Sequence, residues 1–294
     1  MSILLRFWGT RGSIPTPGNK TRRYGGNTSC IGINVDDGLF IFDAGTGLRE
    51  LGDELLSNNN QPIEAHLLFS HTHWDHIQGF PFFAPAYVPS TSLHVYEIAH
   101  GDERFTRLLM GQMRSEYFPV SFSDLGGKIV PEYFSESRCS INGVSLHCQE
   151  QTHPGRSFAY RMETQGKRIV YATDSELDLV LENAEACARD PETLRLAPRR
   201  TLDFVRDADL LVADAQYTDE EYKQKIGWGH SRIFTVVDLA ISANVKRLAL
   251  FHHDPQHSDD RIDSIVEVAR QRAESRGSKV DVFAAREGMT LKIG

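Results

Sequence analysis

His71-Thr72-His73-Trp74-Asp75-His76 is the most informative stretch of this chain, because it gathers three imidazoles and one carboxylate. Imidazole suits borderline divalent metals, and a carboxylate adds the charge that holds a second ion. The stretch follows the apolar segment Ala65–Ser70, which is typical of a buried strand. Side chains two apart on an extended segment point the same way, so we expect His71 and His73 to bind one ion and Asp75 and His76 to face a neighbouring one. The alternative, a histidine-rich surface loop, is disfavoured by this density of ligand-type residues.

The overall composition predicts one large globular domain covering residues 1–294, with 40% hydrophobic and 24% charged residues. The net charge is −8, which disfavours duplex nucleic acid as a partner because such binding depends on Lys and Arg at phosphates. No apolar run is long enough to span a bilayer, and the N-terminus does not look like a signal peptide, so we expect no membrane partner and a cytoplasmic location. The four cysteines are predicted to be free thiols.

Predicted strands come in two batches, and helices follow each batch. The expected strands are Ile3–Trp8, Ile31–Val35, Leu39–Phe42, Ala65–Ser70, Ser92–Tyr96, Lys128–Phe134, Cys139–Ile141, Val144–Gln149, Phe158–Glu163, Arg168–Ala172, Asp209–Ala213, Arg247–Phe251 and Val280–Phe283. The expected helices include Gly47–Leu56, Phe105–Met113, Ser231–Ala243 and Asp259–Arg276. This order predicts an α+β fold, a four-layer αβ/βα sandwich with two sheets face to face and helices outside.

Three further ligand candidates stand near the ends of predicted strands, where loops commonly build sites: His153, Asp174 and His252. Two of them have other interpretations, since His153 before Pro-Gly could be a turn residue and Asp174 could cap a helix. His252 and His253 are adjacent, so on a strand they face opposite sides and only one can serve this site. We choose His252.

With these positions in hand, the sequence resembles the metallo-β-lactamase superfamily over nearly its whole length. The resemblance rests on Asp43 in Phe42-Asp43-Ala44-Gly45-Thr46-Gly47, on the cluster from His71 to His76, and on His153, Asp174 and His252 in the family order. It implies two divalent ions, with zinc expected first and manganese or iron as alternatives. It also implies that one ion is held by His71, His73 and His153, the other by Asp75, His76 and His252, and that Asp174 bridges both while Asp43 orients the ligands.

Gly227-Trp228-Gly229-His230-Ser231 narrows the resemblance to the phosphodiesterase branch, which includes tRNA 3′-processing endonucleases and small cyclic-phosphate diesterases. This branch implies that His230 acts as a general acid beside the scissile phosphate and that Asp214 orients it. Asp75 is counted with them as catalytic. The helix after His230 is expected to point its amides at the same anion. The alternative is a plain loop with Ser231 as helix cap.

We therefore predict a binuclear metal-dependent phosphodiesterase whose metal-bound hydroxide attacks a small phosphodiester, with a cyclic nucleotide as the leading substrate. The acidic charge argues against tRNA, as does the lack of a lysine-rich arm; the segment from Ile98 to Gly127 could form a lid but has mixed charge. The alternatives are a thioester or lactone hydrolase, a tRNA 3′-processing endonuclease, and a non-enzymatic di-iron gas sensor. The sequence leaves the oligomeric state open, and the resemblance adds a homodimer as one option because members of the superfamily are often dimers.

The roles of Arg11, Arg22, Arg23, Trp74 and Trp228 stay open. The arginines could reach a phosphate or be solvated surface charges. The aromatic residues that flank the site in sequence could stack a base or serve as core residues and loop anchors: Trp74, Phe82, Phe83, Tyr217 and Trp228.

Overall fold

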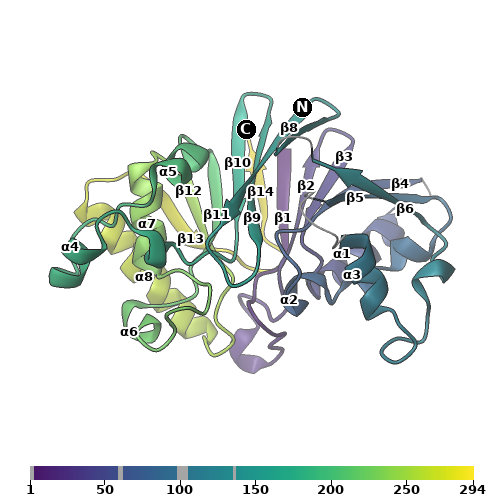
Figure 1. The fold of residues 1–294 in the computed structure, drawn as a ribbon, viewed down its shortest axis with the longest axis horizontal. Coiled ribbons are helices and arrows are strands. Elements are labelled where there is room, and N and C mark those ends of the chain that lie inside the picture. The colour runs from purple at the N-terminus through teal and green to yellow at the C-terminus, as the bar shows by residue number, and fades with distance from the viewer. Residues whose placement is uncertain (1–2, 59–61, 98–104, 135–136) are drawn as a thin grey trace. The chain divides into compact units, whose positions relative to one another are not determined.

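The computed structural model describes residues 3–58, 62–97, 105–134 and 137–294. The chain divides into two compact units. Unit 1 comprises Met1–Gly18, Gly25–Asn142 and Arg286–Gly294, and unit 2 comprises Asn19–Tyr24 and Gly143–Ala285. Each unit contains a mixed β-sheet with helices (Figure 1). A single domain over residues 1–294 remains our proposal.

The sheet of unit 1 has the strand order β14-β1-β2-β3-β4-β5-β6. Its strands are β1 (Ile3–Gly9), β2 (Cys30–Val35), β3 (Gly38–Phe42), β4 (Ile63–Leu68), β5 (Thr91–Glu97), β6 (Lys128–Tyr133) and β14 (Thr290–Ile293). Strands β14, β1, β2 and β3 pair antiparallel, whereas β3, β4, β5 and β6 pair parallel. Because β3 and β4 are parallel neighbours, their carboxyl ends lie side by side, with Phe42 opposite Leu68.

Helix α1 covers one face of this sheet because its apolar residues recur every three or four positions. Leu48 and Leu51 of α1 share a hydrophobic cluster with Ile41 of β3 and Leu67 of β4. The helices of unit 1 are α1 (Gly47–Asn58), α2 (Trp74–Ile77) and α3 (Phe105–Gln112). Short 3₁₀ turns lie at Phe80–Phe82, Ala84–Tyr87 and Phe122–Asp124. Within the expected lid, residues 98–104 lie outside the described part of the chain.

The sheet of unit 2 contains, in order, β13, β12, β11, β10, β9 and β8. Their bounds are β8 (Val144–Gln151), β9 (Ser157–Thr164), β10 (Lys167–Ala172), β11 (Leu210–Asp214), β12 (Arg247–Phe251) and β13 (Asp281–Ala284). The four strands from β10 to β13 are parallel, and β8, β9 and β10 are antiparallel neighbours. Strand β7 (Arg138–Ile141) precedes β8 across Asn142 and Gly143, which both have positive φ as a tight turn of this type requires.

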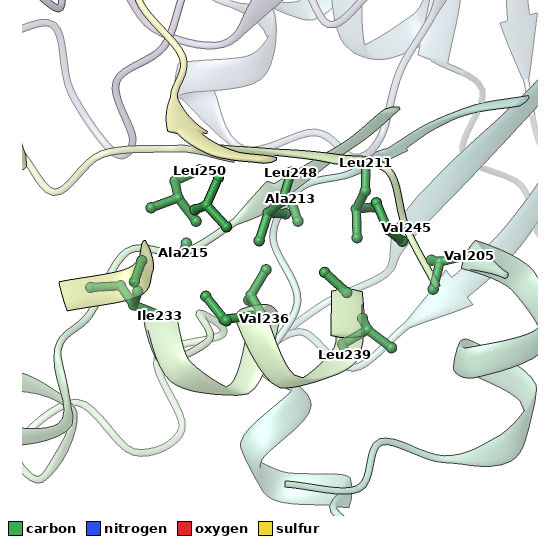
Figure 2. Packing of buried hydrophobic residues seen from close by; sticks show 14 of the residues in the cluster. Val205, Leu211, Ala213, Ala215, Ile233, Val236, Leu239, Val245, Leu248 and Leu250 are labelled. Atoms are coloured by element: carbon green, nitrogen blue, oxygen red, sulfur yellow. The ribbon is translucent and has the colours of Figure 1, made fainter. Parts of the chain in front are cut away.

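The core of unit 2 lies where helix α7 (Ile233–Ser242) packs on β11 and β12. Figure 2 shows Ile233 and Val236 of α7 on the side of the helix that faces Leu248 and Leu250 of β12. These central strands are buried along their length, which explains why they are continuously apolar rather than alternating. The helices of unit 2 are α4 (Ala184–Arg189), α5 (Arg199–Val205), α6 (Asp219–Tyr222), α7 (Ile233–Ser242) and α8 (Asp259–Ser275), with 3₁₀ turns at Asn19–Thr21 and Leu177–Val180.

The strands expected from the sequence are observed, mostly within one or two residues of the predicted ends. Apart from the 3₁₀ turns, three short elements of the described part of the chain were not expected: β14, α5 and α6. All four cysteines are free thiols, as predicted. Among the described residues, no helix combines the length and apolar character that a membrane crossing requires.

Candidate metal centre

In unit 1, the ends of two parallel strands position the candidate ligands. The amide of Asp43, one residue past β3, donates to the carbonyl of Leu68 at the end of β4 over 2.9 Å. Asp43 then adopts φ of 60°, a left-handed conformation that non-glycine residues seldom adopt. The chain therefore turns at this point and leaves the Asp43 carboxylate beside the segment that follows β4.

The buried Asp43 carboxylate links that segment to helix α2. Its Oδ1 accepts the amide of Ser70 at 2.7 Å, and its Oδ2 accepts the Ser70 hydroxyl and Nδ1 of His76, each at 2.8 Å. Because Nδ1 of His76 donates to a carboxylate, the neutral ring carries its lone pair on Nε2, the form that a metal ligand needs. Asp43 therefore fixes the orientation of the His76 ring, and the metal-ligand role of His76 stays a prediction.

The side chains of the histidine stretch gather closely. The His71 ring lies 4.5 Å from the His73 ring and 4.2 Å from the His76 ring, measured between centroids. Nε2 of His76 lies 3.2 Å from Oδ2 of Asp75, which also accepts the amide of Ser13 at 2.7 Å. Two ligand atoms that bind the same ion at about 2.0–2.1 Å lie about 3.3 Å from each other in a tetrahedral site. The His76–Asp75 pair therefore has the spacing of two ligands of one metal.

In unit 2, the register of three parallel strands brings polar residues to one edge of the sheet. Ala172 of β10 pairs with Ala213 of β11, and Asp214 pairs with Phe251 of β12. Asp174 and His252 follow the ends of β10 and β12, and both have positive φ, of 50° and 60°. Such conformations cost roughly 1–3 kcal/mol each and concentrate at functional sites.

The resulting Asp174 cluster consists of four buried residues, Asp174, Asp214, His230 and His252. Nε2 of His252 lies 3.3 Å from Oδ1 of Asp174, again the spacing of two ligands of one ion. Nδ1 of His230 donates to Oδ2 of Asp214 at 2.8 Å, and the His230 ring stacks on His252 with centroids 4.9 Å apart. One ligand atom from each of the four residues lies within 4.8 Å of the others, so the donors fit a divalent cation.

Glu176 organises the loop before His230, although sequence reasoning assigned it no role. This fully buried carboxylate accepts the amides of Gly227 and Gly229 and the hydroxyl of Tyr222, each at 2.7 Å. The carbonyl of Gly229 in turn accepts Nδ1 of His153 at 2.9 Å. A Cβ atom on residue 229 would lie 2.2 Å from that nitrogen, so the contact requires glycine. No sequence signal marked Glu176, because its partners are mainly backbone amides.

Two interpretations of the start of α7 are wrong, the alternative that Ser231 caps the helix and the expectation that the helix amides point at the substrate anion. Ser231 is no helix cap, because α7 begins at Ile233 and the Ser231 hydroxyl accepts the amide of Leu177 at 3.1 Å and donates to the carbonyl of Ser175. The first amides of α7 are also not directed at an anion from outside. Arg232 donates its amide to the carboxylate of Asp178 at 2.8 Å, and Ile233 donates to the carbonyl of Tyr217 at 2.8 Å.

The structure separates the two adjacent histidines after β12. His252 contacts Asp174, as described above, whereas Nε2 of His253 donates to the carbonyl of Ala285 at 2.8 Å. The His253 ring also meets Tyr24 edge-on, with centroids 5.8 Å apart. Asp174 does not cap a helix; the turn at Leu177–Val180 has Glu176 at its N-cap.

The arginines and aromatic residues that are candidates for substrate contact differ in their burial and in their partners. Arg11 is fully buried, and its Nε donates to the carbonyl of Gly25 at 2.8 Å, so its interactions are internal. Arg23 forms ion pairs of 2.6 Å with Asp260 and Asp263. The aromatic side chains that flank the candidate ligands divide into buried ones, Phe83 and Tyr217, and exposed ones, Trp74, Phe82 and Trp228. Burial raises the pKa of the Tyr217 phenol, and the negative charge of nearby Asp214 raises it further, so the phenol stays protonated at neutral pH.

Comparison with known proteins agrees with this architecture. The sequence model of the beta-lactamase superfamily domain matches residues 39–253. Ribonuclease Z of Haloferax volcanii is 25% identical, and the alignment covers 100% of this chain and 96% of that protein. Among solved structures, the metallo-beta-lactamase fold protein YhfI from Bacillus subtilis has a TM-score of 0.67 at 17% identity, with 99% of both chains covered. The short form of human tRNase Z has a TM-score of 0.66 at 16% identity, also with 99% of both chains covered.

These findings confirm the predicted fold class, since two mixed sheets with flanking helices match the α+β sandwich of the superfamily. They also confirm the resemblance and the prediction of a metal-dependent hydrolase that acts on phosphodiesters. The predicted substrate partner is wrong: the relatives aligned end to end are ribonucleases Z, so the preference for a small phosphodiester over nucleic acid is overturned. The net charge misled because it averages the whole surface, whereas phosphate binding depends on local charge at the site.

Proposed function

The chain belongs to the beta-lactamase superfamily, and from this premise we propose that it is a divalent-metal-dependent nuclease that hydrolyses a phosphodiester bond in tRNA. The observation that carries the proposal is the similarity to ribonuclease Z over essentially the full length of both proteins. The tRNA substrate is drawn from the tRNase Z that shares the fold. The Asp214–His230 pair supports phosphodiester chemistry, since a thioester or lactone hydrolase has no need of it.

We propose that both clusters contribute to a pair of metal ions. His71, His73 and His153 would hold one ion and Asp75, His76 and His252 the other, with Asp174 on both. This assignment joins residues of the two units and rests on the family resemblance and on the donor chemistry within each unit. When bound, such ions activate water for attack at neutral pH and neutralise charge on phosphate oxygens. Zinc is our proposed identity, with manganese or iron as alternatives, because imidazole and carboxylate donors accept all three. A cytoplasmic location and a homodimer also remain proposals.

His230 is proposed to pass a proton to the leaving oxygen. Its Nδ1 is engaged by Asp214, so Nε2 is the atom that can donate outward. Asp214 is itself held by the amides of Ser175 and Gln216, each at 3.2 Å. Stacking of the His230 ring on His252 further restricts its rotation. A positioned general acid typically contributes about 10²–10⁴-fold to the rate.

A second role for His230 must be separated from this one, because its ligand atoms and those of Asp214 lie close enough to Asp174 and His252 to bind a cation themselves. The variants His230→Ala and Asp214→Asn decide between the roles. Each would be tested for metal content by elemental analysis and for cleavage of a precursor tRNA. His94→Ala is the matched control, since His94 lies on β5 and pairs with Glu132 at 2.9 Å.

We expect both variants to keep two metal ions per chain and to lose turnover by about 10²–10⁴-fold. Loss of metal from His230→Ala would make His230 a ligand rather than a proton donor. Unchanged turnover would remove its catalytic role. If the metal-loaded wild-type protein leaves precursor tRNA intact but hydrolyses a thioester or a lactone, the proposed function itself is wrong.

A further inference from the structure

Trp228 is a large apolar side chain held at the surface of unit 2 by a rigid loop. It is 58% exposed, and its two neighbours, Gly227 and Gly229, have φ of 84° and 92°. The amides of both glycines bind the two carboxylate oxygens of the buried Glu176 at 2.7 Å. The backbone on either side of the indole is therefore fixed. An exposed indole on a fixed backbone is better suited to bind a ligand than one on a loop that must first be ordered, because less conformational freedom is lost.

A cation accompanies the indole. Nζ of Lys225 lies 3.8 Å from the centroid of the Trp228 ring, within the range of a cation–π interaction. The amide of Trp228 donates to the carbonyl of Lys225 at 3.1 Å, so both residues belong to one tight turn. The ammonium therefore lies over one face of the indole. Aromatic side chains that stack bases and cations that meet phosphates are typically combined where proteins bind single-stranded nucleic acid.

The same loop leads directly to the residues proposed for chemistry. Gly229 accepts the hydrogen bond of His153, and His230 follows it in the chain. The rings of His153 and His230 meet edge-on with centroids 5.6 Å apart. Two residues of chain span at most about 7 Å, so the Cα atoms of Trp228 and His230 lie within that distance of each other.

We propose that Trp228 and Lys225 form a stacking subsite for one unpaired nucleotide of the RNA, adjacent to the bond that is hydrolysed. This inference rests on the proposed function and adds where a base is bound. The nucleotide must be unpaired, because a base inside a duplex already stacks on its neighbours. The subsite discriminates little among bases, because every base has a π-face.

The test compares cleavage of two RNAs that differ only at the nucleotides flanking the cleaved bond, one with normal bases and one abasic there. Trp228→Ala should lower kcat/KM for the normal RNA by about 5- to 140-fold, mainly through KM, since stacking contributes about 1–3 kcal/mol per base and each 1.4 kcal/mol is tenfold. It should leave the abasic RNA unaffected. Trp228→Phe should recover most of the loss. Lys225→Ala should weaken both RNAs and reduce their salt dependence.

Ile226→Ala is the matched control, because Ile226 is 60% exposed on the same loop and should leave both rates unchanged. Equal losses on both RNAs in Trp228→Ala and Trp228→Phe would show a damaged loop and overturn the stacking role. Unchanged rates together with an altered oligomeric state by light scattering would assign Trp228 to contact with a second copy of the chain, which also overturns it. If the wild-type protein cleaves neither RNA, the proposed function fails as well, and the wild-type rates alone reveal this.

Discussion

The two candidate clusters reach similar chemistry by different construction. In unit 1, His71, His73, Asp75 and His76 are almost consecutive, and a single turn into α2 brings them together. In unit 2, Asp174, Asp214, His230 and His252 come from separate segments and meet because the register of β10, β11 and β12 aligns the strand ends. The first arrangement depends on local chain order, and the second depends on long-range pairing of strands.

The buried carboxylates that hold the two candidate regions in place also differ, since one bonds to a side chain and the other mainly to the backbone. Asp43 in unit 1 bonds directly to the imidazole of His76. Glu176 in unit 2 bonds to two backbone amides and one phenol, and acts on His153 only through the carbonyl of Gly229. Substitution of Asp43 should therefore mainly lower metal affinity, whereas substitution of Glu176 should mainly lower the stability of the loop that it holds.

The largest effect should come from removing His252, the candidate ligand that the strand register of unit 2 brings to Asp174. We expect His252→Ala to lose metal and nearly all turnover, because its Nε2 faces Asp174. His253→Ala, the adjacent control, should keep its metal and lose only the stability of one buried hydrogen bond, about 1–3 kcal/mol. Elemental analysis and denaturant titration measure both. Metal loss confined to His253→Ala would reverse the assignment.

The next effect concerns Asp43, the direct support in unit 1. Asp43→Asn should weaken metal binding by about 10- to 100-fold, because a neutral amide cannot accept the His76 hydrogen bond as strongly as a carboxylate. Competition with a chelator measures the affinity. An unchanged affinity would show that the histidine stretch orients itself without help, and the contrast between the two units would lose its basis.

A smaller effect is expected at Glu176, the indirect support in unit 2. In Glu176→Gln one carboxylate oxygen becomes an amide nitrogen that cannot accept the hydrogen bond of a glycine amide. The variant should lose about 1–3 kcal/mol of unfolding free energy yet retain its metal content. Urea unfolding of the two proteins, with metal analysis alongside, checks both parts. Metal loss greater than that of Asp43→Asn would contradict the proposed order of supports.

The smallest effect is a pH dependence at Glu221, a residue of α6 that belongs to neither cluster. Burial alone would raise the pKa of Glu221, but hydrogen bonds from His257 and the Thr218 amide outweigh it and hold the pKa well below its ordinary value of 4.5. The ionised carboxylate therefore stabilises the fold above about pH 4.5, and this contribution is lost as pH falls toward the lowered pKa.

Glu221→Gln should remove that contribution. The wild-type protein should exceed the variant in stability at pH 7 by less than about 1 kcal/mol, because the pair is partly exposed, and the difference should shrink at pH 3. Urea unfolding at the two pH values measures it. A difference that stays constant between them would show that the charge of Glu221 contributes nothing.

Much of the fold was predictable because strands and ligands share one pattern, an apolar run that ends in a polar residue. Leu248–Phe251 followed by His252 is an example, and the structure places that histidine just beyond β12. Strand β14 was missed because Thr290–Ile293 is short and becomes a strand only by pairing with β1, where Ile293 faces Ile3. Helices α5 and α6 were missed because they span only Arg199–Val205 and Asp219–Tyr222, too few residues to show a clear apolar period.

The linear order of residues was sufficient to propose the donors and to predict the metal-dependent class of chemistry, because imidazole and carboxylate groups bind divalent cations wherever a chain gathers them. Which of two neighbouring histidines faces Asp174, what Ser231 and Glu176 do, and how Trp228 is presented were settled only in three dimensions. Those answers depend on strand register and on hydrogen bonds to backbone atoms, and no residue type in the sequence reports where a distant amide will lie.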